Sequence, residues 1–93
     1  MDIEEYRGFT IQSQPGETQG DTVAFEFHVS RGRERELVCR CEVAREVLAQ
    51  LDHDLGRARE RCLQAIRHVL DRDEYIKGES FTLAITSFGM HRG

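Results

Sequence analysis

Apolar and polar residues alternate with a period of two in four segments of the chain, which is the pattern of half-buried β-strands. These segments are residues 7–12, 22–30, 35–43 and 80–88. Between the first two lies a polar stretch, residues 13–21, which contains the only proline and two glycines. That composition is typical of turns, so we expect a loop there.

The period changes to three and four residues across 44–72, which predicts helix. The polar run Asp52-His53-Asp54 interrupts this stretch, and Asp54 is a good N-cap residue. We therefore favour a short helix at 44–51 followed by a longer one at 54–73. The alternative is one continuous helix, since a seven-residue repeat joins Leu48, Leu55, Cys62 and Val69. Such a helix would extend beyond a sheet of ordinary strands and would imply a dimer.

The 93 residues are enough for one domain, which we place at 1–93. Because each strand has one apolar face, a single helical layer on a single sheet would bury all of them. The predicted fold class is thus α+β, a two-layer sandwich with the element order β-β-β-α-α-β. An antiparallel three-stranded meander comes first, followed by the helices and a final strand.

The turn between residues 22–30 and 35–43 decides which side chains face each other. A loop formed by residues 32–34 places Phe27 opposite Cys39, so that apolar faces meet. A loop of two residues would instead place Phe27 opposite Val38 and would expose an entire apolar set. We therefore predict the Phe27–Cys39 register, with the long helix covering both residues.

The three cysteines are the sharpest candidates for a metal or redox site. Cys39 and Cys41 share a strand face, and Cys62 lies on the apolar stripe of the long helix that would cover it. A zinc site needs four converging ligands, and no histidine falls on the same face. Free cysteines are also common core residues. We interpret all three as core thiols and assign no metal ligand, with metal binding and redox sensing as the alternatives.

Catalytic motifs are missing from the sequence. No Cys or Ser lies beside a histidine at a helical or strand spacing, and no glycine-rich phosphate loop occurs. We expect no catalytic site, no cofactor and therefore no enzyme activity. The chain has no apolar run of membrane-spanning length. Its acidic start differs from a signal peptide, so we expect a cytoplasmic protein without membrane association.

Two surfaces are candidates for interactions. One side of the long helix carries Arg57, Arg61 and His68. The other candidates are His28 and Arg40 on the outer face of the sheet, and Phe88 near the end of its last strand. The net charge of −4 argues against nucleic acid as the main partner.

Residues 41–48 (Cys-Glu-Val-Ala-Arg-Glu-Val-Leu) form a strand-to-helix junction, and residues 60–66 (Glu-Arg-Cys-Leu-Gln-Ala-Ile) belong to the second helix. With these two segments, the stretch 23–86 resembles a family of small proteobacterial proteins of unknown function. The resemblance implies an α+β fold and no active residue.

From these observations we expect a small protein-interaction or regulatory module that forms a homodimer and binds a protein partner that the sequence does not identify. The alternative is an accessory nucleic-acid-binding protein that uses the arginine-rich helix face.

Overall fold

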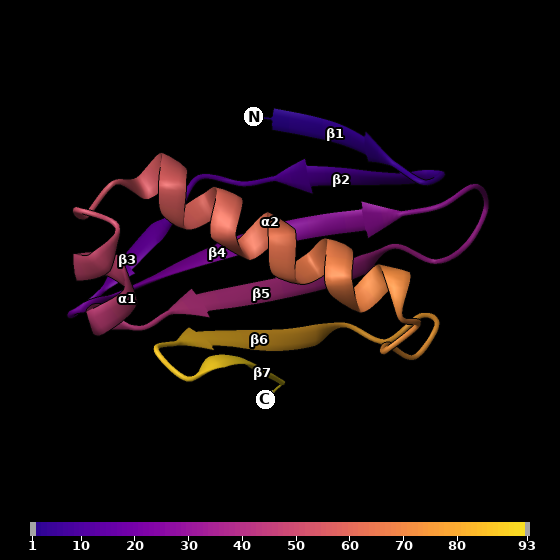
Figure 1. Ribbon diagram of the computed structural model, residues 1–93. Helices are drawn as coiled ribbons and strands as arrows, with labels where there is room; N and C mark the ends of the chain where they lie inside the picture. The colour runs from indigo at the N-terminus through magenta and orange to yellow at the C-terminus, as the bar shows by residue number, and fades with distance from the viewer. Residues whose placement is uncertain (1, 93) are drawn as a thin grey trace.

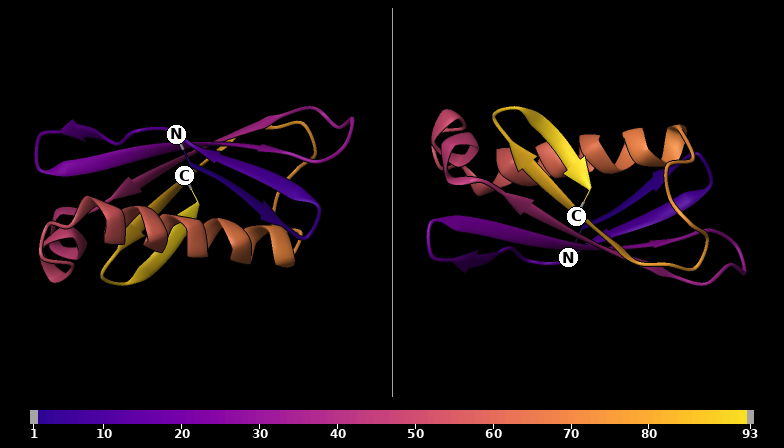
Figure 2. Two further views of the ribbon diagram at one scale, coloured as in Figure 1. Left: turned by 90° about the horizontal axis from the view of Figure 1, so that it is seen from above. Right: turned by 90° about the horizontal axis from the view of Figure 1, so that it is seen from below.

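The computed structural model describes residues 2–92. Within this part of the chain, two helices cover one face of a seven-stranded sheet (Figures 1 and 2). The strands are β1 (Asp2–Tyr6), β2 (Phe9–Ser13), β3 (Glu17–Gln19), β4 (Thr22–Ser30), β5 (Leu37–Val43), β6 (Phe81–Thr86) and β7 (Gly89–Arg92). The helices are α1 (Arg45–Gln50) and α2 (Leu55–Asp71).

The predicted order β-β-β-α-α-β is wrong, because the sheet is larger and mixed. Its strands follow the order β1-β2-β4-β5-β6-β7, and β3 pairs with β4 beside β2. The pairs from β1 to β5 are antiparallel, whereas β6 returns parallel to β5 after the helices. The prediction missed β1, β3 and β7, three short strands without an alternating apolar pattern.

The register of the β4–β5 hairpin is as predicted. Phe27 lies opposite Cys39, and the neighbouring pairs Phe25–Cys41 and Val29–Leu37 are also apolar. All six of these side chains are buried. The odd-numbered loop therefore brings the apolar faces of both strands to the same side of the sheet.

The predicted break between the two helices is confirmed. Asp52 and His53 both adopt left-handed backbone conformations, with φ of 56° and 55°, which no α-helix can contain. The Asp54 carboxylate then accepts the Arg57 N–H at 3.1 Å and caps α2. From this start α2 crosses the sheet and buries one apolar stripe, formed by Ala58, Cys62, Leu63, Ile66, Val69 and Leu70. Among residues 2–92, no helix combines the length and the apolarity that crossing a membrane requires.

Strand β1 is attached to α2 by polar contacts. Because side chains alternate along a strand, Asp2, Glu4 and Tyr6 all face the helix. Asp2 forms an ion pair with Arg59, and Glu4 accepts a 2.7 Å hydrogen bond from Arg67 Nε. The Tyr6 hydroxyl and Arg7 donate to Asp71 at 2.6 and 2.7 Å. This polar seam explains how a strand with a single aliphatic residue, Ile3, joins the sheet.

Truncating Phe27 tests the core. Phe27→Ala should lower the free energy of unfolding by about 3–5 kcal/mol, because it removes a fully buried aromatic ring. Urea denaturation followed by circular dichroism measures the change. Phe88→Ala is the matched control, since that ring is 91% exposed and its loss should cost below about 0.5 kcal/mol. Similar losses for the two variants would contradict the assignment of Phe27 to the core.

A double-mutant cycle tests the polar seam. Glu4→Gln and Arg67→Gln, alone and combined, should give a coupling of about 1 kcal/mol, because both side chains are at least two-thirds buried. The control is the exposed Arg57–Asp52 pair, for which we expect a coupling close to zero. Equal couplings in the two cycles would show that the seam contributes no more than an ordinary surface ion pair.

Candidate functional site

A groove of about 420 Å³ lies between α2 and the β6–β7 hairpin. Its walls are formed by Arg61, Gln64, Ala65 and His68 from the helix, and by Ile85, Gly89 and Met90 from the hairpin. A second depression of about 230 Å³ is lined by Leu51, Arg57, Glu60, Arg61 and Gln64. Since the two share Arg61 and Gln64, they form one continuous surface, which we call the α2 groove.

Helical spacing explains why these residues share one side of α2. Arg57, Arg61 and Gln64 follow one another at intervals of four and three residues, and His68 lies four residues further on. They border the apolar stripe that packs on the sheet. The structure therefore brings together Arg57, Arg61 and His68, three of the candidates identified from the sequence.

Most arginines of α2 are already paired. Arg57 contacts Asp52 at 3.3 Å, Arg59 pairs with Asp2, and Arg67 pairs with Glu4 and Glu60. The hydrogen bonds from Arg67 hold the pKa of Glu4 below its ordinary value.

Arg61 differs from these arginines. Within residues 2–92 it makes no ion pair or hydrogen bond, and its side chain is exposed. It is thus the one α2 arginine whose charge is available to a partner from outside the described chain.

The floor of the α2 groove is apolar. Ile85 is buried beneath it, and the partly buried Met90 packs against the same core. Met90 belongs to β7, the last strand of the sheet, whose outer edge pairs with no other strand of the described chain. Sequence reasoning missed Met90 because Gly-Met-His-Arg shows no apolar alternation. The signal that could have indicated β7 is Gly89, which adopts a φ of 117° at the end of the tight β6–β7 turn.

Phe88 lies in that same turn, next to Gly89 at the border of the α2 groove. Its 91% exposure makes it the most exposed large apolar residue described. An aromatic ring so fully in water at the edge of a groove is available for contact with a partner.

His28 and Arg40 lie elsewhere, on the opposite face of the sheet. Both line a separate depression of about 430 Å³ together with Glu26. The His28 ring contacts Glu36 at 2.8 Å through Nδ1 and Glu26 at 3.1 Å through Nε2. Arg40 faces Glu26 across the β4–β5 ladder and lies 4.0 Å from Glu42. This second set of candidates is therefore held by its own carboxylates.

The three cysteines are fully buried, as predicted for core thiols. Hydrogen bonding with Cys41 and burial raise the pKa of Cys62, and burial raises the pKa of Cys39. Both thiols are therefore protonated at neutral pH and are poor nucleophiles. No group of three or more His, Cys, Asp or Glu side chains among residues 2–92 is placed to hold a metal ion.

Comparisons with protein-family models, with curated proteins and with solved structures gave no match. The resemblance to small proteobacterial proteins accordingly stays a prediction. The functional argument rests on the geometry of the chain itself.

The carboxylates around His28 predict a pH-dependent stability. The hydrogen bond to Glu36 raises the pKa of His28 above its ordinary value of 6.5, against the opposing effect of burial. A raised pKa means that the folded state binds the proton more tightly than the unfolded state. The stabilisation is complete below about pH 6.5 and is lost as the pH rises through the folded pKa.

The measurement is the free energy of unfolding between pH 5.5 and 9 for wild type and His28→Gln. We expect the wild type to lose, over the upper part of this range, a stabilisation that the variant lacks at every pH. His53→Gln, at an exposed histidine, is the control and should follow the wild type. Parallel curves for wild type and His28→Gln would show that the pair of carboxylates does not stabilise the imidazolium.

Proposed function

We propose that the protein is a non-catalytic protein-interaction module whose docking surface is the α2 groove. The occupant is a segment of another protein that combines an acidic side chain with apolar ones. The observation that carries this proposal is the position of Arg61, an unpaired cation directly above the apolar floor formed by Ile85 and Met90. An acidic group would pair with Arg61, while apolar neighbours would cover Met90 and Phe88.

The pairing of the other arginines disfavours the nucleic-acid alternative. Phosphate binding draws its affinity from several cations that act together. On α2, Arg57, Arg59 and Arg67 are neutralised by carboxylates, so the helix presents only Arg61 and the exposed His68. One free arginine suits a single carboxylate better than a row of phosphates.

We assign this module to the cytoplasm, where three buried cysteines would remain thiols. A second copy of the chain is the alternative occupant, because the free edge of β7 could pair with its counterpart in a homodimer. The solution mass distinguishes these two occupants.

Peptide selection tests the docking surface. Random dodecapeptides displayed on phage are selected on the immobilised protein, and enriched peptides are synthesised and titrated by fluorescence anisotropy. We expect enriched peptides to carry Asp or Glu next to apolar residues. Arg61→Glu should weaken their binding about tenfold or more, equivalent to about 1.4 kcal/mol. The matched control is Arg33→Glu, a charge reversal at an exposed arginine in the β4–β5 loop, which should leave binding unchanged.

Several outcomes would contradict the proposal. Enriched peptides that are basic, or that bind Arg61→Glu as well as wild type, would remove the α2 groove from the function. A dimer mass by sedimentation that reverts to a monomer on Met90→Glu would assign the groove to a second copy. Binding to duplex DNA at physiological salt, with a steep salt dependence, would favour the nucleic-acid alternative.

A further inference from the structure

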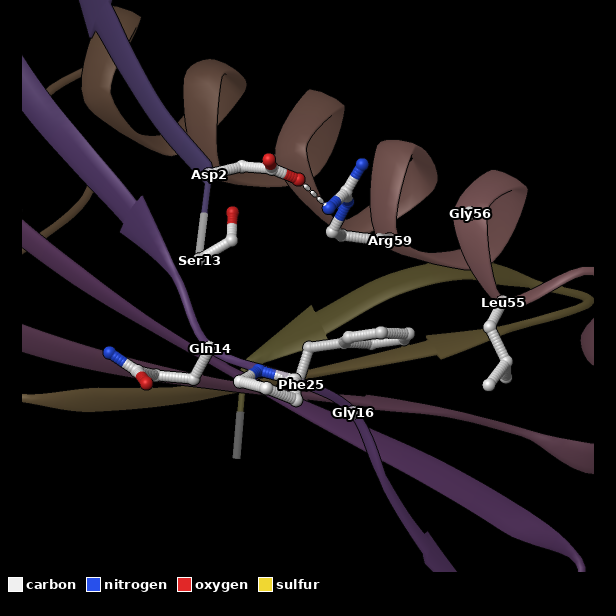
Figure 3. Close-up of a pocket in the computed structure, with 9 residues that line it drawn as sticks. Asp2, Ser13, Gln14, Gly16, Phe25, Leu55, Gly56 and Arg59 are labelled. Carbon is white, nitrogen blue, oxygen red and sulfur yellow. Dashed lines mark hydrogen bonds and ion pairs between the residues drawn. The ribbon is translucent and has the colours of Figure 1, made fainter.

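A smaller pocket of about 250 Å³ lies where β2 ends beside the first turn of α2 (Figure 3). Its polar lining comes from Asp2, Ser13, Gln14 and Arg59, and its apolar lining from Pro15, Phe25 and Leu55. Two glycines, Gly16 and Gly56, complete the walls. The pocket shares no lining residue with the α2 groove, and the inference drawn from it does not depend on the proposed function.

Ser13 is the distinctive residue of this pocket. It is only 4% exposed and is the one buried polar residue described within residues 2–92. The alternation of β2 turns it to the helix side of the sheet, where Phe9 and Ile11 are apolar. Its hydroxyl has no hydrogen-bond partner in the described part of the chain, and Figure 3 shows it directed toward the side chains of Asp2 and Arg59. A buried hydroxyl without a partner is costly, so a ligand that bonds to it would gain affinity.

Arg59 adds a second unused donor. One terminal nitrogen of its guanidinium pairs with Asp2, as the dashed line in Figure 3 shows. Its Nε is buried and has no hydrogen-bond partner among the described residues. Ser13 and Arg59 thus provide two neighbouring groups that lack an acceptor.

The start of α2 favours negative charge at the same place. The first helical backbone bond runs from the Ala58 N–H to the Asp54 carbonyl, so the N–H groups of Leu55 and Gly56 precede it. These two residues line the pocket, and the helix dipole adds partial positive charge there.

We propose that this pocket binds a small monocarboxylate with a short apolar tail. The carboxylate accepts hydrogen bonds from Ser13 and the Arg59 guanidinium, and the tail packs on Phe25 and Leu55. A volume of about 250 Å³ is below the usual range for cofactor sites, so a nucleotide does not fit. The charge of Asp2 already balances that of Arg59, which favours a singly charged ligand over phosphate.

Titrations followed by ¹H–¹⁵N correlation spectra of the full-length protein test the site, with sodium butyrate and sodium benzoate as probes. Butyramide and inorganic phosphate serve as the neutral and the doubly charged comparison. We expect saturable shifts of the Ser13, Leu55, Gly56 and Arg59 amides with the two carboxylates. Butyramide and phosphate should bind at least about tenfold more weakly.

Two variants separate the site from general effects of the acids. Ser13→Ala should weaken butyrate binding about tenfold, the loss expected for one hydrogen bond to a charged group. Gly56→Ala should also weaken it, because the added methyl group narrows the pocket while alanine suits the helix. Ser87→Ala, at an exposed serine in the β6–β7 turn, is the matched control and should bind like wild type.

Shifts that do not saturate, or that persist unchanged in Ser13→Ala and Gly56→Ala, would overturn the assignment. So would butyramide or phosphate binding as strong as that of butyrate. The spectra of the variants, which should retain the dispersion of the wild type, show that any loss of binding comes from the pocket and not from unfolding.

Discussion

The pairing of Phe27 with Cys39 across β4 and β5 is the contact on which the rest of the structure depends. It fixes the parity of the central hairpin and thereby collects the apolar side chains of both strands on one face. Strand β6 adds Leu83 next to Cys41 in the same layer, and α2 covers this layer with a stripe that includes Cys62 and Ile66. A slip by one residue would turn this face toward solvent and leave α2 nothing to pack on.

The polar seam between β1 and α2 links the stability of the fold to its surface chemistry. By holding the edge strand, Asp2 and Glu4 neutralise Arg59 and Arg67. Arg61 projects toward the β6–β7 hairpin, where the described chain offers it no acid. The same sheet that needs arginines at one edge therefore leaves a single free cation near the other edge.

Strong apolar patterns could be predicted from the sequence, and weak ones could not. The alternation around Phe27 and the capping residue Asp54 led to the correct hairpin register and helix break. Strand β1 was missed because its helix-facing residues are polar and are stabilised by distant partners such as Arg67, a contact that no local pattern reveals. Helical spacing grouped Arg57, Arg61 and His68, but the α2 groove also requires Met90 from an unpredicted strand.

The most direct test of the central contact is a nuclear Overhauser measurement on the labelled protein. The account predicts strong effects between the Phe27 ring protons and the β protons of Cys39, together with backbone contacts that align Glu26 with Arg40. Effects from the Phe27 ring to the Val38 side chain instead would place the hairpin in the even register, with its apolar face divided between the two sides of the sheet. That result would contradict the core, the position of α2 and the grooves that depend on it.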